Sequence, residues 1–213
     1  MMNCCFIFSG GALNDTSFID KEYIVRSGSL VICADKGYKY AKALGIKPDI
    51  LIGDFDSYTD ELPADAEIIR TPAEKDDTDT MLAVKLAIER GCEFITLYGA
   101  LGARFDHTFA NIQTLIYAHE HGCDLMIDDG DNIVSVQGIC IRSYGFMDGW
   151  YLSLFSLSEQ SEITRLTGVK YPINNLILKD SYPLGVSNEI IAREAVLSVA
   201  SGLVLVVQSK DTN

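Results

Sequence analysis

Hydrophobic and polar positions follow two different rhythms along this chain of 213 residues. Up to about residue 128, short apolar runs alternate with stretches in which apolar residues recur at helical spacing. The runs that we interpret as buried strands are Cys4–Phe8, Leu30–Ala34, Ile50–Gly53, Glu67–Thr71, Phe94–Tyr98 and Asp124–Ile127. Strands that alternate with helices over connections long enough for crossovers predict a mostly parallel sheet covered by helices on both faces.

Two of the intervening segments carry clear helical signals. The first runs from about residue 78 to residue 90, with Met81, Val84 and Ile88 on one face. The second runs from about residue 107 to residue 121. A glycine follows each segment directly, and glycine is the usual stop signal of a helix.

After the turn-rich residues 128–132 the helical period disappears. The apolar runs that follow are Ile133–Val136, Cys140–Arg142, Trp150–Phe155, Glu162–Leu166, Asn175–Leu178, Ala195–Val199 and Leu203–Gln208. Short strands separated by Gly, Asp, Pro and Ser are typical of a small β-sandwich or barrel. The sequence therefore predicts an α/β domain over residues 1–128 and an all-β, sandwich-like domain over residues 129–213.

Composition and charge narrow the range of partners. Thirty acidic residues against seventeen basic ones give a formal charge of −13, which repels a nucleic-acid backbone. No apolar run reaches the roughly eighteen residues of a membrane-spanning helix, and no basic region precedes the first apolar run. Six scattered cysteines without a C-x-x-C pair predict reduced, packed thiols. We therefore expect a cytoplasmic protein that binds neither nucleic acid nor membranes.

Carboxylates gather where the predicted parallel strands end. Asp35 follows the second strand, and Asp54 and Asp56 follow the third. Side chains two apart on an extended chain point to the same side, so Asp54 and Asp56 are placed to bind one hard cation such as magnesium. The alternative is that both aspartates simply form the turn at the strand exit.

Further acidic residues precede the predicted helix that begins at about residue 78. Asp76 and Asp79 are three apart, which would put them on a common helical face. The competing interpretation is that acidic side chains here satisfy the amide groups and the dipole of a helix N-terminus.

A glycine-containing segment, residues 99–107, follows the fifth strand and leads into a helix. Its glycines would let the backbone approach a phosphate, and Arg104 offers a planar fork for phosphate oxygens. His107 is interpreted as a helix-start or core residue, because no second histidine stands at ligand spacing. The chain lacks a Walker loop, a G-x-G-x-x-G motif and a G-x-S-x-G elbow, so a nucleotide would have to be held in another way.

The motifs together resemble one family. They are Asp35-Lys36-Gly37, Gly53-Asp54-Phe55-Asp56-Ser57, Asp76-Asp77-Thr78-Asp79, Gly102-Ala103-Arg104-Phe105-Asp106-His107, Gly168-Val169-Lys170-Tyr171-Pro172 and Gly185-Val186-Ser187-Asn188-Glu189. In this order they resemble the thiamine pyrophosphokinases over nearly the whole chain. Departures are small: Val169 and Ile173 stand where the family pattern has leucine, and Ala103 stands where a glycine is common.

The resemblance implies an enzyme that transfers a pyrophosphoryl group from ATP to the hydroxyl of thiamine, with release of AMP. It implies that residues 1–128 form the nucleotide-binding catalytic domain and residues 129–213 the thiamine-binding domain. It also implies a magnesium requirement and a homodimer with thiamine near the subunit interface.

Residue roles are carried over by the same resemblance. Magnesium would be held by Asp54, Asp56 and Asp79, with Arg104 on a phosphate oxygen and Asp106 orienting either Arg104 or the water shell of the metal. Further substrate-binding positions are Asp35, Ser57, Asp76, Thr78 and Gly102, together with Tyr171, Ser187 and Asn188 for thiamine. Asp35 is also a second candidate ligand of the metal.

Two other classes of protein remain open. Asp54-Phe55-Asp56 after an apolar strand also resembles the nucleophile motif of haloacid-dehalogenase-type phosphatases, although Tyr58 stands where that motif has Thr or Val. A binding module without turnover would keep the pocket but would not form AMP.

Overall fold

The computed structural model describes residues 3–55, 62–72, 76–102 and 104–211. The chain divides into two compact units, Met1–Gly130 and Asp131–Asn213. The expected domain boundary at residues 128 and 129 lies beside this division.

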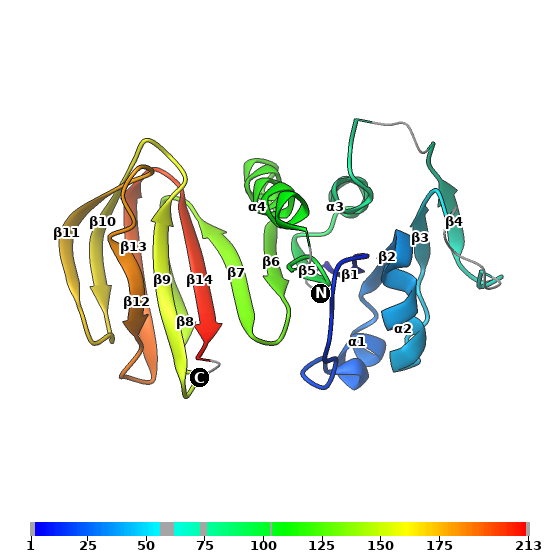
Figure 1. Cartoon of the computed structure of the whole chain (residues 1–213), viewed down its shortest axis with the longest axis horizontal. Coiled ribbons are helices and arrows are strands. Elements are labelled where there is room, and N and C mark those ends of the chain that lie inside the picture. The colour runs from blue at the N-terminus through cyan, green and yellow to red at the C-terminus, as the bar shows by residue number, and fades with distance from the viewer. Residues whose placement is uncertain (1–2, 56–61, 73–75, 103, 212–213) are drawn as a thin grey trace. The chain divides into compact units, whose positions relative to one another are not determined.

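The first unit is built on parallel strands in the order β6-β5-β1-β2-β3-β4 (Figure 1). Their bounds are β1 Cys4–Phe8, β2 Leu30–Ala34, β3 Ile50–Gly53, β4 Glu67–Arg70, β5 Phe94–Tyr98 and β6 Asp124–Asp128. Each neighbouring pair in this order runs parallel. The chain passes from β1 outward to β4 and then returns to β5 on the other side of β1. The strand order therefore reverses between β1 and β5.

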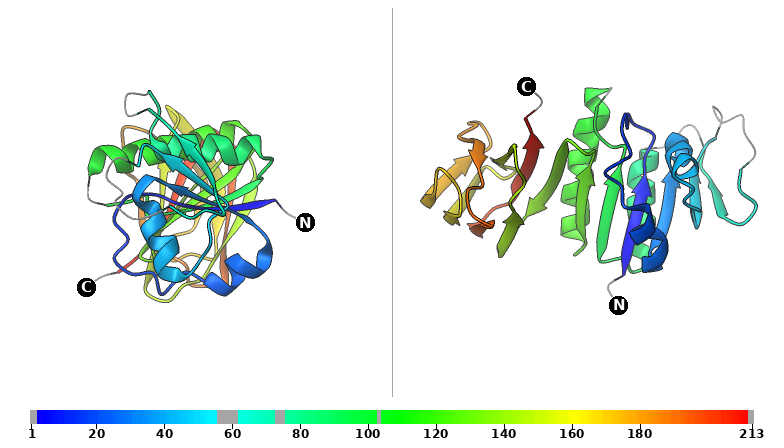
Figure 2. Two further views of the ribbon diagram at one scale, coloured as in Figure 1. Left: turned by 90° about the vertical axis from the view of Figure 1, so that its right-hand side faces the viewer. Right: turned by 90° about the horizontal axis from the view of Figure 1, so that it is seen from below.

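Helices connect these strands and cover the sheet. They are α1 Lys21–Ser27, α2 Tyr38–Leu44, α3 Asp79–Glu89 and α4 Phe105–Glu120, with a short 3-10 turn, η1, at Asp35–Gly37. Helices α1 and α2 lie on one face and α3 and α4 on the other (Figures 1 and 2). The predicted α/β layering of the first half is therefore present.

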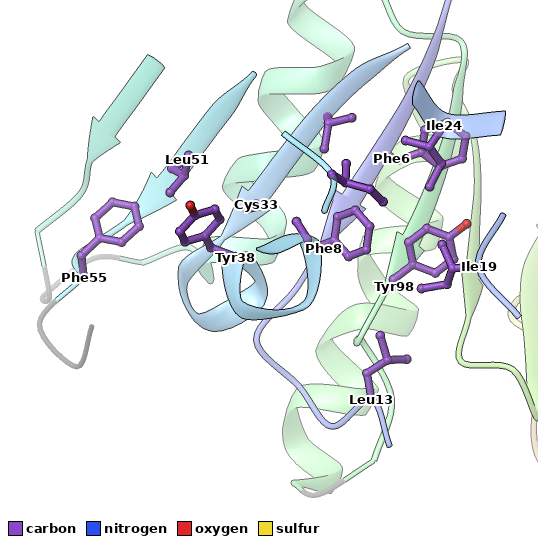
Figure 3. Close-up of a cluster of buried hydrophobic side chains, with 13 residues drawn as sticks. Phe6, Phe8, Leu13, Ile19, Ile24, Cys33, Tyr38, Leu51, Phe55 and Tyr98 are labelled. Atoms are coloured by element: carbon purple, nitrogen blue, oxygen red, sulfur yellow. The ribbon is translucent and has the colours of Figure 1, made fainter. Parts of the chain in front are cut away.

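Alternation along the strands builds a core on each face. Phe6 and Phe8 of β1 belong to a buried cluster that also contains Ile24 of α1 and Tyr38 of α2 (Figure 3). Ile7 lies between the two phenylalanines in sequence, is fully buried, and points to the opposite face because successive side chains of a strand alternate. That face is covered by α3, which contacts both β1 and β2.

One prediction about the first unit was wrong in detail, and the helix α3 adds a finding of its own. The run that forms β4 is not a buried strand: β4 is the last strand in the order, and Ile68 is 39% exposed. The buried face of α3 comprises Thr80, Ala83, Val84 and Ala87, while Met81 and Ile88 are only partly buried. Alanines let the helix approach the sheet closely, so the larger side chains flank the contact instead of filling it.

The second unit is all β. Its strands are β7 Asn132–Gln137, β8 Ile141–Gly145, β9 Trp150–Ser156, β10 Gln160–Thr167, β11 Ile173–Lys179, β12 Gly185–Glu189, β13 Glu194–Ser201 and β14 Val204–Lys210. They follow the orders β12-β9-β14-β7 and β11-β10-β13-β8, with antiparallel pairing within each group. Across the chain, parallel and antiparallel pairs both occur, so the fold is a mixed one with a β-rich second unit.

One buried cluster joins the two groups of strands. Leu152 of β9 and Val206 of β14 share it with Leu166 of β10 and Leu197 of β13. Two antiparallel layers that enclose one core are the arrangement of a β-sandwich. Strand β12, which carries the Gly185–Glu189 motif, was not expected as a strand.

The described cysteines are free thiols, and four of them are buried: Cys5, Cys33, Cys92 and Cys123. Cys140, in the turn just before β8, is exposed, against the expectation of packed thiols. Within the described residues, no helix is long and apolar enough to cross a membrane.

Candidate active site

A cavity of about 350 Å³ opens at the carboxyl edge of the parallel strands. The residues that line it are Ser9, Gly10, Gly11, Ala34, Asp35, Lys36, Thr78, Asp79, Thr80, Gly99, Ala100, Leu101, Gly102, Arg104, His107 and Asn111. They come from the end of β2, from the turns after β1, β2 and β5, and from the segments that lead into and form the first two turns of α3 and α4. The cavity thus lies where the strand order reverses between β1 and β5, which is where open α/β sheets bind ligands.

Two glycine loops form one wall of this cavity. Gly11, after β1, donates its N–H to the carbonyl oxygen of Gly99, after β5, at 2.9 Å. A Cβ at Gly11 would collide with that same oxygen, and a Cβ at Gly99 would lie 2.7 Å from the Ser9 carbonyl oxygen. The backbones of the two loops can approach this closely only because neither position carries a side chain.

Asp35 enters the cavity from η1, directly after β2. Its backbone is left-handed, with φ at 47°, a region that aspartate occupies more readily than most residues. Gly53 at the end of β3 lies against it: a Cβ at Gly53 would be 3.1 Å from the Asp35 Cα. Asp54 directly follows Gly53, so it lies next to this contact between β3 and Asp35. Asp54 itself is not among the residues that line the cavity.

Asp79 is the first residue of α3 and lines the cavity. The hydroxyl of Thr71, just after β4, donates to its Oδ1 at 3.3 Å, which ties the end of β4 to the start of the helix. Thr78 also lines the cavity, but its hydroxyl accepts from the Met81 N–H at 3.1 Å and caps the helix. Because α3 begins only at Asp79, Asp76 precedes the helix, and the expectation that both aspartates share a helical face was wrong.

Arg104 and Asp106 form a two-point ion pair at the start of α4. The Arg104 Nε donates to Asp106 Oδ1 at 3.1 Å, and its Nη2 donates to Oδ2. This pairing raises the pKa of Arg104 and, through the same hydrogen bonds, lowers the pKa of Asp106. Both side chains are largely exposed. Helix α4 starts at Phe105, two residues before the expected position, so Asp106 lies in its first turn.

Not all of the expected site residues lie within the described part of the chain. Asp56 and Ser57 lie outside the described residues, so of the expected Asp54–Asp56 pair only Asp54 is described. Within the described ranges, no three His, Cys, Asp or Glu side chains are grouped so that they could hold a metal ion by themselves. The described carboxylates at the cavity wall are Asp35 and Asp79.

In the second unit, the thiamine-side candidates lie together on β12 and the loop before β11. Asn188 accepts from the Tyr171 N–H at 3.0 Å and donates to the Tyr171 carbonyl oxygen at 2.8 Å, so its amide pairs with that backbone as a neighbouring strand would. Ser187 has a left-handed backbone with φ at 59°, and its N–H donates to the Ser153 hydroxyl at 3.0 Å. The Tyr171 side chain is 61% exposed.

The pairing of β12 with β9 explains the unusual backbone of Ser187. Gly185 opposes Leu154 and Asn188 opposes Leu152, so β12 carries an extra residue, a β-bulge. Bulges redirect side chains, and left-handed non-glycine residues cluster at functional sites.

Several lining residues were missed by the sequence reasoning. Ser9, Gly10 and Gly11 directly follow the first predicted strand, and this glycine pair at a strand end was a signal that could have identified them. Lys36, Thr80 and Asn111 also line the cavity. Thr80 and Asn111 carry no sequence signal, since they are ordinary polar residues inside helices.

Fold and site together define a class: an α/β protein whose carboxyl edge gathers glycine loops, carboxylates and cations around one cavity, followed by a β-rich domain. Two family models match the chain: "Thiamin pyrophosphokinase, catalytic domain" over residues 22–127, and "Thiamin pyrophosphokinase, vitamin B1 binding domain" over residues 140–204. The chain belongs to the thiamine pyrophosphokinase family, whose enzymes use ATP as co-substrate.

Individual relatives agree with this assignment. The thiamine pyrophosphokinase of Bacillus subtilis is 32% identical over 191 residues, which cover 86% of this chain and 88% of the relative. The crystal structure of a Bacillus subtilis thiamine pyrophosphokinase matches with a TM-score of 0.87 and 29% identity, over 98% of this chain and all of the other. A thiamin pyrophosphokinase from Geobacillus thermodenitrificans matches with a TM-score of 0.84 and 28% identity, over 99% of each chain.

Proposed function

We propose that this enzyme, with magnesium, transfers the pyrophosphoryl group of ATP to the hydroxyl of thiamine and releases AMP. The observation that carries the proposal is the cavity at the reversal of strand order, lined by glycine loops, Asp35, Asp79 and Arg104. The thiamine hydroxyl attacks the β-phosphorus, the bond from that phosphorus to the oxygen of the α-phosphate breaks, and AMP leaves. Negative charge then develops on the transferred group and on the departing phosphate.

The donors around the cavity fit magnesium. Asp79 supplies a carboxylate at the cavity wall, and Asp54 follows the strand end that contacts Asp35. An all-oxygen donor set suits magnesium, which binds proteins through one or two carboxylates together with phosphate oxygens. We assign Asp54, Asp56 and Asp79 to the metal and Asp35 to a supporting position. Magnesium bound there would neutralise charge on the phosphate oxygens.

Cationic side chains on the same wall would take the remaining phosphate charge. Arg104 and Lys36 both line the cavity, and Asp106 holds the Arg104 guanidinium through two hydrogen bonds. A guanidinium fixed in this way loses less side-chain entropy on binding an anion than a free one would. Gly102, Thr78, Asp76 and Ser57 complete the proposed ATP side.

The second unit would bind thiamine. Tyr171 offers an exposed aromatic surface to the cationic thiazolium ring, and Ser187 and Asn188 are the polar candidates for the aminopyrimidine. Because the Asn188 amide pairs with the Tyr171 backbone, it would also fix the position of the Tyr171 ring.

We further propose that the enzyme works as a homodimer in the cytoplasm, with thiamine near the subunit interface. The exposed hydrophobic side chains of the second unit support association: Ile141, Phe146, Ile177, Leu184 and Ile191 are each at least 45% exposed. The four buried free thiols suit a reducing compartment.

The test is an omission assay on the purified protein with ATP, magnesium and thiamine. We expect AMP to form only when all three are present, and Asp79→Asn to slow AMP formation about a hundred- to thousand-fold. ADP as the nucleotide product would make the protein an ordinary kinase, and phosphate release without thiamine would make it a phosphatase.

A further inference from the structure

We propose that the side chains of Thr80, Tyr40 and Asn111, from three different helices, are positioning residues that hold the two glycine loops in the shape that binds the phosphates of a nucleoside triphosphate. The nature of the ligand rests on the proposed function. The positioning role rests on hydrogen bonds within the first unit.

The first contact joins α3 to the loop after β1. The hydroxyls of Ser9 and Thr80 lie 2.6 Å apart, and both side chains line the cavity although Ser9 is only 5% exposed and Thr80 only 8%. A buried hydroxyl costs free energy unless it is hydrogen-bonded, so each of these groups stabilises the other in place. The pair fixes the start of the loop against the first turn of α3.

The second contact joins α2 to the same loop. The Tyr40 hydroxyl donates to the Gly11 carbonyl oxygen at 2.6 Å and accepts from the Leu13 N–H at 3.0 Å. One hydroxyl thus satisfies two backbone groups of the turn that follows Gly11. The Gly11 N–H is already bonded to Gly99, so the loop after β1 is held on both sides.

The third contact joins α4 to the loop after β5. The Asn111 amide donates to the Ala100 carbonyl oxygen at 2.7 Å, and Asn111 is 6% exposed. This carbonyl group lies between Gly99 and Gly102, whose left-handed backbones, with φ at 66° and 85°, shape the loop. Fixing the carbonyl therefore fixes the path of the loop between the two glycines.

The three contacts converge on one wall of the cavity. The loops are joined to each other by the Gly11–Gly99 bond and to α3, α2 and α4 by one side chain each. Glycine loops are the most flexible part of such a site, and a flexible loop must be ordered when ligand binds. A loop that is already held in its binding shape does not have to be ordered when the ligand binds. Losing one of the three hydrogen bonds should therefore weaken nucleotide binding more than it weakens thiamine binding.

The test uses matched variants at Thr80. Thr80→Val keeps the shape and removes the hydroxyl, whereas Thr80→Ser keeps the hydroxyl and removes a methyl group. We expect Thr80→Val to raise the KM for ATP about three- to tenfold, the factor expected for one hydrogen bond, with the KM for thiamine unchanged and Thr80→Ser close to wild type. Tyr40→Phe should behave like Thr80→Val, with Tyr23→Phe, an exposed tyrosine of α1, as the control.

Calorimetric binding of magnesium and a non-hydrolysable ATP analogue provides a readout that does not depend on turnover. We expect the same three- to tenfold weakening for Thr80→Val and Tyr40→Phe. If wild type binds the analogue but makes no AMP, the proposed reaction fails while the positioning role is still tested. If Thr80→Val does not fold, Ser9→Ala removes the same hydrogen bond from the other side. The inference would be overturned if Tyr40→Phe and Thr80→Val, or Ser9→Ala in its place, bound the nucleotide as tightly as wild type. It would also be overturned if these variants lost as much affinity for thiamine as for ATP.

Discussion

Asp79 begins α3 and is, with Asp35, one of the two described carboxylates that line the cavity. Asp79→Asn keeps the size of the side chain and removes its charge. We expect turnover to fall about a hundred- to thousand-fold, because a preorganised electrostatic contact to the reacting phosphates is lost. Steady-state AMP formation measures this, and circular dichroism checks the fold.

Asp65→Asn is the matched control for that experiment. Asp65 is also a carboxylate of the first unit, but its side chain is 85% exposed and lies away from the cavity lining. Its turnover should equal that of wild type. A near-normal rate for Asp79→Asn would assign Asp79 to the helix N-terminus alone, as the competing interpretation of the sequence holds.

At the scale of single residues, the sequence predicted side chains with a chemical signature and missed those without one. Asp35, Asp79 and Arg104 were identified because charged residues directly after strands or before helices indicate a ligand site. Asn111 was missed because only the fold brings it beside Ala100, eleven positions earlier in the chain. The same holds for the pairing of Asn188 with Tyr171.

At the scale of elements, the end of β6 holds a carboxyl group, Asp128, whose ionised form is disfavoured in the folded protein. Burial, and then the neighbouring Asp129, raise the pKa of Asp128, while its Oδ1 accepts from the Gly130 N–H at 2.9 Å. A raised carboxyl pKa means that the stability this group contributes is fully present below its ordinary value of about 3.9 and is lost as the pH rises through the folded-state pKa. Asp128→Asn keeps a side-chain oxygen that can accept the hydrogen bond from the Gly130 N–H. Because asparagine does not ionise, this variant does not lose stability as the pH rises.

We therefore expect Asp128→Asn to be more stable than wild type at pH 7, with the difference shrinking steadily as the pH is lowered toward 4. Urea unfolding at a series of pH values measures it, with Asp65→Asn as an exposed control. A difference that is absent at pH 7, or that does not change with pH, would contradict the assigned cause.

Strands were more predictable than helices for a physical reason. β1, β2, β3 and β5 begin and end where their apolar runs do, because strands inside a parallel sheet are covered on both faces and are therefore mostly apolar. The short helices α1 and α2 were not identified, since seven residues hold barely two turns of periodic signal. Strand β12 was missed because its burial is partial and its bulge interrupts the alternation.

For the whole molecule, the proposed homodimer raises the question whether two subunits share a site. We propose that Tyr171, Ser187 and Asn188 of one subunit complete a site whose metal side is formed by Asp54, Asp56 and Asp79 of the other. Asp54→Asn and the double variant Ser187→Ala, Asn188→Ala should each be nearly inactive. Mixing them under conditions of subunit exchange should restore part of the activity, because some heterodimers then carry one intact site.

Exchange itself must be measured in the same experiment, for example with two fluorescent labels. Proven exchange without any recovery of activity would exclude shared sites. Full specific activity in a monomer isolated by dilution would do the same, and neither result would alter the chemistry assigned to the cavity.

The most direct test of the central claim is the fate of labelled phosphorus in a single turnover. Enzyme, magnesium and thiamine are mixed with ATP that carries radioactive phosphorus at either the α or the γ position, and the products are separated. Pyrophosphoryl transfer predicts that the α label appears in AMP and the γ label in thiamine diphosphate. An α label in ADP with the γ label in thiamine monophosphate, or a γ label released as inorganic phosphate without thiamine, would contradict the account.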